Sequence, residues 1–190
     1  MAHADPGRKT AAATERFEAV VVANLDAAYN FARWLTRNEH DAQDVVQEAC
    51  LRAFRFLGTY RGGNDRAWLL AIVRNAYYTS LKQSHAQVQH VALDGDGMPT
   101  EGTVAPGWDA DDGEDALRIL EREDMRRSVD QALAGLSDEF REVIVLRELE
   151  EMSYQEIATI AQIPIGTVMS RLSRARKQLL QLLKSARADW

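Results

Sequence analysis

Residues Ser153–Leu183, SYQEIATIAQIPIGTVMSRLSRARKQLLQLL, decide the fold of this chain. Ser153 followed three residues later by Glu156 is the pattern of a capping box, which predicts the start of a helix. Because the residue before a proline is disfavoured in the α region, this helix is expected to end before Pro164. A proline also suits the first turn of a second helix. The stretch therefore predicts two helices joined by a tight turn.

The second of these helices has one apolar face and one cationic face. Apolar residues recur at steps of three and four, which predicts a buried stripe of Ile165, Val168, Leu172, Ala175 and Leu179. The outward positions are polar and basic, with no acid before Asp189: Thr167, Met169, Ser170, Arg171, Ser173, Arg174, Arg176 and Lys177. Such an arrangement is typical of a helix-turn-helix that reads the major groove of DNA. The alternative is an ordinary helical hairpin with a solvated basic face.

Length and composition fit a globular chain of one or two domains. It has 190 residues, 46% of them hydrophobic, and no apolar run approaches the roughly 20 residues of a membrane helix. The N-terminus lacks the apolar core of a signal peptide, so we expect a cytoplasmic protein. The single cysteine, Cys50, excludes an internal disulfide and reads as a small core residue. The four histidines show no metal-site spacing, and we expect neither a metal nor a cofactor.

The net charge of −6 hides a strong polarity along the chain. The segment 91–115 carries eight acids and no Lys or Arg, whereas 165–188 carries six cations and no acid. The cationic segment provides a local surface for DNA. The acidic total nevertheless implies weak non-specific affinity of the isolated protein for DNA. The protein is therefore expected to bind DNA with help from a partner.

The N-terminal half is predicted to contain a helix over Glu15–Arg37 and another over Asp41–Leu57. The second is expected to bury Val45, Val46, Ala49, Ala53, Phe54 and Leu57. Its other side carries carboxylates three and four residues apart, which share a helix face. We name the acidic face by its four polar members, Asp41, Asp44, Gln47 and Glu48. The alternative is a solvated surface without a partner.

A glycine-rich loop, GTYRGGNDRAW over 58–68, follows this helix. It contains an aromatic ring, a guanidinium and an amide, from Tyr60, Arg61 and Asn64, which suit stacking on and hydrogen bonding to unpaired bases. A plain turn between helices would explain the glycines alone. Asp65 is expected to cap a helix over 66–83. One face of that helix is polar and aromatic, as on nucleic-acid-binding surfaces, and carries Arg74, Asn75, Tyr78 and Lys82.

These patterns divide the chain into four predicted parts. Residues 1–14 form a disordered tail, 15–83 a first helical domain, 84–123 a flexible acidic linker, and 124–187 the helix-turn-helix domain. The last part includes helices over Leu117–Leu133 and from Asp138 to Glu150. The predicted fold class is thus all-α, with two small domains.

The order of these pieces resembles the extracytoplasmic-function sigma factors of bacterial RNA polymerase, in the sigma-70 family. The most specific part is GTVMSRLSRAR at 166–176, and the second is DAQDVVQEA at 41–49. The resemblance implies two helical domains, called σ2 and σ4, and no catalytic activity of its own. It also implies binding to core RNA polymerase and promoter DNA, and an anti-sigma factor as the usual regulator.

Residue roles follow from the resemblance position by position. The acidic face would dock on the clamp helices of the polymerase β′ subunit, and Val143, Ile144 and Leu146 would pack on the β flap. Minus-10 contacts would come from Tyr60, Arg61, Asn64, Arg74, Asn75 and Tyr78. Minus-35 contacts would come from Thr167, Ser170, Arg171, Ser173, Arg174, Arg176 and Lys177.

Met169 and Ser173 depart from the family pattern, where the first position is commonly Arg or Lys and the second is often aromatic or His. Met169 cannot make a bidentate contact with guanine, so the resemblance does not define the preferred minus-35 sequence. Two other functions are alternatives. A free-standing helix-turn-helix regulator would need a dimerisation helix or a ligand-binding domain. A nucleic-acid enzyme would need a catalytic cluster, and Asp41, Asp44 and Glu48 on a regular helix make a poor one.

Overall fold

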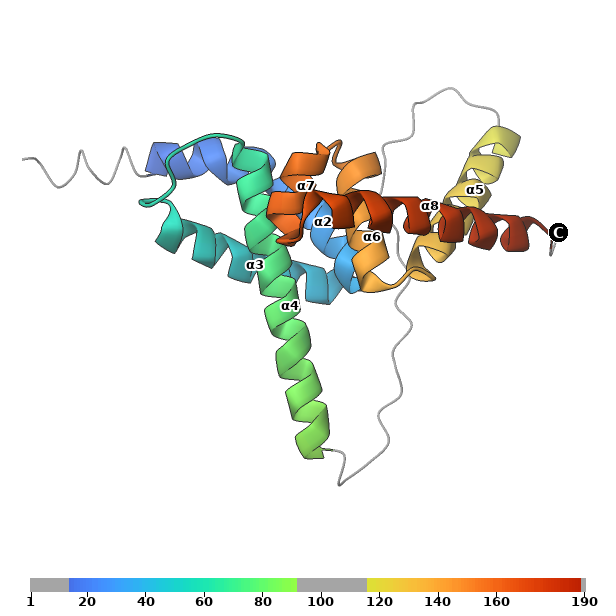
Figure 1. The fold of residues 1–190 in the computed structure, drawn as a ribbon, viewed down its shortest axis with the longest axis horizontal. Coiled ribbons are helices and arrows are strands. Elements are labelled where there is room, and N and C mark those ends of the chain that lie inside the picture. Colours follow the sequence, from blue (N-terminus) through green and yellow to red (C-terminus); the bar gives the residue numbers. More distant parts are fainter. Residues whose placement is uncertain (1–13, 92–115, 189–190) are drawn as a thin grey trace, which may run out of the picture. The chain divides into compact units, whose positions relative to one another are not determined.

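The computed structural model describes residues 14–91 and 116–188, and every element in these ranges is a helix (Figure 1). The predicted tail, apart from Thr14, and the linker residues 92–115 lie outside them. The described residues form two compact units, one of residues 14–32 and 40–91 and the other of 33–39 and 116–188. The prediction of an all-α fold is confirmed. Within the described ranges no helix is both long and apolar enough to cross a membrane.

The first unit contains a helical segment at 14–20, the 3-10 turn η1 (Val22–Asn24), α2 (Leu25–Thr36), α3 (Glu39–Phe56) and α4 (Asp65–Val91). The single helix predicted over 15–37 is wrong, because η1 interrupts it. Three consecutive β-branched valines, with low helix propensity, precede the break. Val20 and Val21 are both buried, although neighbouring residues of a continuous helix point in different directions. The side-chain amide of Asn24 donates to the Val20 carbonyl at 2.9 Å.

The core of the first unit comes from the apolar faces of α2, α3 and α4. On α3 the buried residues are Ala42, Val45, Val46, Ala49 and Ala53, as the spacing predicts for four of them. Phe54, also predicted to be buried, is instead 65% exposed and makes an edge contact with Phe17 at 5.7 Å between ring centroids. Ala53 takes the core position, and its neighbour then points about 100° away around the helix. Cys50 is half-buried, and this burial raises the pKa of its thiol.

The second unit contains α5 (Ala116–Ala134), α6 (Asp138–Ile144), the π-helical turn η2 (Val145–Leu149), α7 (Tyr154–Ala161) and α8 (Ile165–Ala188). Helix α8 packs against α5, α6 and α7. The helix predicted from Asp138 to Glu150 is present, but its last turn, η2, has π-helical bonding. Three residues of this segment are buried in the core with at most 2% of their surface exposed: Val143, Ile144 and Leu146. Such buried side chains are not available for the β-flap contact that the resemblance implies.

Candidate nucleic-acid interface

The turn between α7 and α8 has the geometry that its sequence predicts. The Ser153 hydroxyl accepts from the Glu156 amide at 3.2 Å, and the Glu156 carboxylate accepts from the Ser153 amide at 2.7 Å. Helix α7 ends at Gln162, whose φ of 55° lies in the left-handed region. The Pro164 carbonyl then accepts from two amides of the first turn of α8, those of Thr167 at 2.8 Å and Val168 at 3.1 Å. The two predicted helices and the capping box are confirmed.

Helix α8 is oriented by a buried stripe of Val168, Leu172 and Ala175, each at most 1% exposed. Ile165, predicted to belong to this stripe, is 41% exposed, because it lies in the first turn where α8 begins to leave the core. The opposite face is open to solvent. Its exposed members are Met169, Ser170, Ser173, Arg174, Arg176 and Lys177, whereas Thr167 and Arg171 are half-buried.

Two arginines of α8 are held by carboxylates from earlier helices. Arg171 pairs with Glu139 of α6 at 2.8 Å, and its side chain is only 19% exposed. Arg176 pairs with Glu148 of η2 at 2.7 Å. Hydrogen bonds to Glu148 and to Tyr154 raise the pKa of the Arg176 guanidinium further. Neither pair joins residues that are close in sequence.

Arg174 is the exposed arginine of α8 for which the described residues provide no ion pair. It lies between the two paired arginines in sequence and points away from the buried stripe. Ser170, one turn earlier on the same side, donates its hydroxyl to the Thr167 carbonyl at 3.0 Å. A guanidinium with a free edge and a nearby hydroxyl suits hydrogen bonding to a base edge in a DNA groove.

The loop between α3 and α4 is shaped by two glycines and by Tyr60. Gly62 and Gly63 have φ of 90° and 125°, which other residues rarely adopt. The Tyr60 ring stacks on Trp68 of α4 at 4.5 Å between centroids, and its hydroxyl donates to Asp65 at 2.7 Å. Burial, followed by this hydrogen bond, raises the pKa of Tyr60 to about 12. Arg16, from the first helical segment, donates to the Tyr60 carbonyl.

These contacts change two of the roles expected from sequence. One face and the hydroxyl of Tyr60 are already used, so Tyr60 shapes the loop and leaves at most one ring face to a base. Asp65 does not cap α4, because it accepts from Tyr60 and lies inside the helix. The cap is Asn64, whose side-chain oxygen accepts from the Ala67 amide at 3.0 Å.

The remaining minus-10 candidates lie along one side of the loop and of α4. Arg61, Asn64 and Asn75 are exposed, whereas Arg74 and Tyr78 are half-buried. The Arg74 guanidinium lies over the Tyr78 ring, 4.7 Å from its centroid. Asn64 and Arg74 are ten residues apart, which is about 15 Å along a helix axis. The group therefore forms an extended polar and aromatic surface, long enough for several nucleotides.

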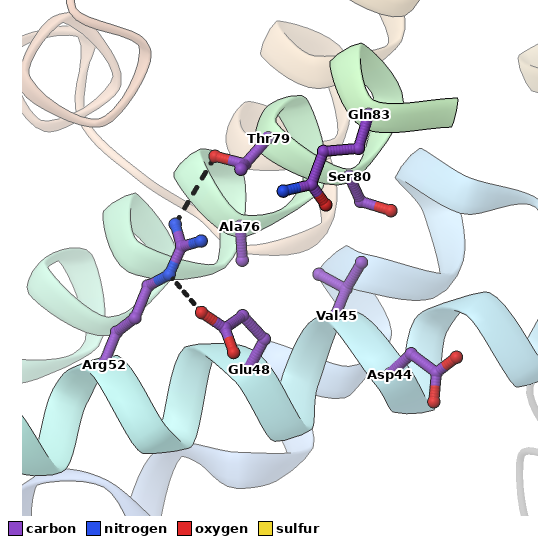
Figure 2. Close-up of a pocket in the computed structure, with 8 residues that line it drawn as sticks. All are labelled: Asp44, Val45, Glu48, Arg52, Ala76, Thr79, Ser80 and Gln83. Carbon is purple, nitrogen blue, oxygen red and sulfur yellow. Dashed lines mark hydrogen bonds and ion pairs between the residues drawn. The ribbon is translucent and has the colours of Figure 1, made fainter. Parts of the chain in front are cut away.

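The acidic face is present on α3 and borders a pocket. Asp41, Asp44 and Gln47 are exposed, and the half-buried Glu48 pairs with Arg52 at 2.7 Å. Arg52 also reaches the Thr79 hydroxyl of α4 at 3.5 Å. Figure 2 shows Arg52 between these two partners, with Asp44 at the far end of the pocket. The pocket has a volume of about 330 Å³ and is lined by Asp44, Val45, Glu48, Arg52, Ala76, Thr79, Ser80 and Gln83.

Several residues with clear roles here were not expected from sequence. Arg52 stands four residues after Glu48, a spacing that does signal an ion pair on a helix. Glu139 and Glu148 have no such signal, because 32 and 28 residues separate them from their arginines. Arg141 reads as a surface charge, yet it is 2% exposed and donates to main-chain carbonyls at the end of α5.

Comparison with known proteins agrees with this geometry in both units. The family model for Sigma-70 region 2 matches residues 20–86, and the model for Sigma-70 region 4 matches residues 126–179. The first match covers α2, α3, the loop and α4 as far as residue 86, and the second runs from residue 126 in α5 to residue 179 in α8.

Individual relatives extend over most of the chain. The RNA polymerase sigma-H factor of Pseudomonas aeruginosa is 35% identical over 166 residues, covering 80% of this chain and 81% of that protein. The ECF RNA polymerase sigma factor SigW of Bacillus subtilis is 30% identical over 174 residues, covering 90% of each. Among solved structures, the sigma factor RpoE of Bartonella quintana, in complex with the anti-sigma factor NepR, matches with a TM-score of 0.71 at 30% identity. That match covers 88% of this chain and 96% of RpoE. The chain belongs to the sigma-70 family, as an extracytoplasmic-function sigma factor.

Proposed function

We infer that this chain directs promoter-specific transcription initiation by RNA polymerase, as a sigma factor that binds the core enzyme and recognises promoter DNA. One observation carries this function beyond family membership. A single chain combines a loop suited to unpaired bases with a helix-turn-helix whose outer face holds an exposed arginine. Recognition of one duplex element and melting of another require these two kinds of surface. The chemistry of RNA synthesis belongs to the polymerase, and we assign no catalytic activity to this chain.

We propose that α8 reads the minus-35 element mainly through Arg174, with Ser170 in support. The exposed position of Arg174 and its free guanidinium edge support this assignment. Ser173 and Lys177 flank it on the same face, and Thr167 lies at the start of the helix, where main-chain amides meet DNA phosphates. Arg171 and Arg176 would contact phosphates, once they are released from their ion pairs with Glu139 and Glu148.

We propose that the loop and α4 contact the minus-10 element. Arg61 and Asn64 would hydrogen-bond to a base taken out of the stack, and the free ring face of Tyr60 would stack on it. Removing a base from a duplex costs a few kcal/mol, which a pocket and stacking offset. Arg74, Asn75 and Tyr78 would contact the adjoining nucleotides along α4.

We propose that the acidic face docks on the clamp helices of the polymerase β′ subunit. Its exposed carboxylates suit a basic partner surface. The β flap remains the proposed partner of the second unit, through exposed residues rather than through the buried Val143, Ile144 and Leu146. The domain limits 15–83 and 124–187 and the linker 84–123 also remain proposals, since α4 and α5 extend into the linker range.

Regulation by an anti-sigma factor is proposed from the complex in which the Bartonella RpoE is found. A sigma factor works where polymerase and chromosome are, so we also propose a cytoplasmic location.

Capture of core RNA polymerase on the tagged, full-length chain tests the proposed function. A sigma factor retains the core subunits from a bacterial lysate and also binds purified core enzyme. A free-standing regulator or a nucleic-acid enzyme retains neither. A free-standing regulator is not favoured, because such a protein has no need of the first unit, which matches Sigma-70 region 2.

Replacing Arg174 by alanine is expected to flatten one position of the minus-35 preference. Loss of a bidentate base contact costs about 1–3 kcal/mol at that base pair and leaves other positions unchanged. Selection of bound sequences from randomised promoters by holoenzyme provides the measurement. Lys177→Ala is the control, since loss of a phosphate contact weakens all sequences alike. An unchanged preference in Arg174→Ala would move the base-reading role to another residue of α8.

A further inference from the structure

The cations on the exposed side of α8 differ in whether a carboxylate forms an ion pair with them. Arg174 and Lys177 are exposed, and no other described residue forms an ion pair with either. Arg176, between them in sequence, is paired with Glu148. Because both side chains of that pair are 48% exposed, solvent and DNA can reach it. In the proposed function Arg176 is one of the minus-35 residues, so the pair belongs to the surface proposed to contact DNA.

The geometry of the pair occupies one whole edge of the guanidinium. A single carboxylate oxygen of Glu148 accepts from Nε of Arg176 at 3.1 Å and from Nη2 at 2.7 Å. This is the edge through which an arginine grips a phosphate in the bidentate manner. Glu148 thus stands where a DNA phosphate oxygen would stand for the same arginine conformation.

The position of Glu148 depends on the π-helical turn η2. Wider i to i+5 bonding in η2 is seen in the Glu150 amide, which donates to the Val145 carbonyl at 3.0 Å. A π-helical turn shifts the residues after it around the helix axis relative to a regular α-helix. This turn brings Glu148 to α8, whereas the buried Val145 and Leu146 anchor it in the core. The fold therefore places Glu148 within reach of Arg176.

Neutralisation of Arg176 has a measurable consequence for DNA binding. Affinity for DNA gains from each cation that displaces condensed counterions, and an ion pair without net charge displaces none. An exposed ion pair contributes about 0.2–1 kcal/mol. A phosphate can therefore replace Glu148, but the free energy of breaking the ion pair reduces the gain from the new contact. We propose that Glu148 competes with DNA phosphate for Arg176 and thereby limits the affinity of this sigma factor for minus-35 DNA. The inference rests on the proposed function.

Glu148→Gln tests the competition, because glutamine keeps the size of the side chain and removes its charge. The probe is a duplex promoter fragment selected from randomised DNA by the wild-type holoenzyme. We expect the variant holoenzyme to bind it roughly 1.4- to 5-fold more tightly at moderate salt, which is the ion-pair free energy expressed as a ratio. The plot of log affinity against log salt should become steeper by about 0.9, the value for one added phosphate contact.

Two matched comparisons isolate the pair. Glu151→Gln removes one charge from an exposed residue of the same connection and controls for net charge. In an Arg176→Ala background, Glu148→Gln should have the same small effect as Glu151→Gln. Weaker binding by Glu148→Gln would overturn the proposal, since Glu148 would then orient Arg176 for DNA. Equal effects of Glu148→Gln in both backgrounds would also overturn it. If the wild-type holoenzyme selects no sequence at all, the proposed function itself fails.

Discussion

Reversing both carboxylates of the acidic face, with Asp44→Lys and Glu48→Lys, is expected to weaken binding to core RNA polymerase by about 2–5 kcal/mol. A carboxylate in an interface is desolvated against a cation of the partner. Lysine in its place brings two positive charges together, which causes such a loss. On a solvated face the same change costs almost nothing. At 2 kcal/mol the dissociation constant already rises about 30-fold. Titration of labelled protein with purified core enzyme measures it directly.

Two variants separate docking from folding. Lysine at position 48 also breaks the pair with Arg52, whereas Asp44→Lys alone leaves that pair intact. Asp44→Lys should therefore weaken core binding with an unchanged circular dichroism spectrum and melting curve. Glu18→Lys with Asp26→Lys makes the same change in net charge at exposed positions off the acidic face. Normal core affinity for the Asp44 and Glu48 double variant would identify the acidic face as solvated surface.

Arg141→Met is expected to destabilise the second unit by about 3 kcal/mol. The Arg141 guanidinium donates to the carbonyls of Leu133 at 3.0 Å, Ala134 at 3.2 Å and Leu136 at 2.6 Å. It thereby satisfies carbonyls where α5 ends and the chain turns into α6. Methionine fills the space but donates nothing, so three hydrogen bonds are lost, at about 1 kcal/mol each.

Hydrogen exchange measures the loss of stability separately in each unit. It therefore suits a chain of two units better than a single melting temperature does. Amides of α6 and α8 should exchange about 100-fold faster in Arg141→Met, and those of α3 at the wild-type rate. Arg127→Met is the matched control. Arg141 pairs with Asp138, three residues before it, at 3.1 Å. Arg127 pairs in the same way with Asp124 at 3.1 Å, but its side chain is 64% exposed. Exchange in Arg141→Met no faster than in this control would contradict the structural role of Arg141.

The parts of the fold that sequence predicts best are those governed by local chemistry. The capping box at Ser153 and Glu156 and the end of α7 before Pro164 depend only on neighbours in the chain. The buried stripe of α8 follows equally from spacing, because Val168, Leu172 and Ala175 lie on one face of any regular helix. These features also orient Arg174, and so the central minus-35 proposal could be made from sequence.

The features that sequence misses depend on packing between distant segments. The ion pairs of Arg171 and Arg176 require α6 and η2 to lie beside α8, which no local spacing announces. Burial of Arg141 depends on where α5 ends. The Tyr60 ring had been expected to be open to a base, but Trp68, eight residues later, covers one face of it. The interruption of the first helix at η1 has a local cause, the three consecutive valines, although the spacing of apolar residues alone still permits a helix there.

Binding of a promoter fragment by the isolated chain and by the chain with core RNA polymerase tests the central claim most directly. The fragment carries both promoter elements, and binding is followed by mobility shift at moderate salt. The net charge of −6 and the two separate DNA-contacting surfaces predict tight, sequence-specific binding only when core enzyme is present. Tight and specific binding by the isolated chain, unchanged on addition of core enzyme, would contradict the sigma-factor function and favour a free-standing regulator.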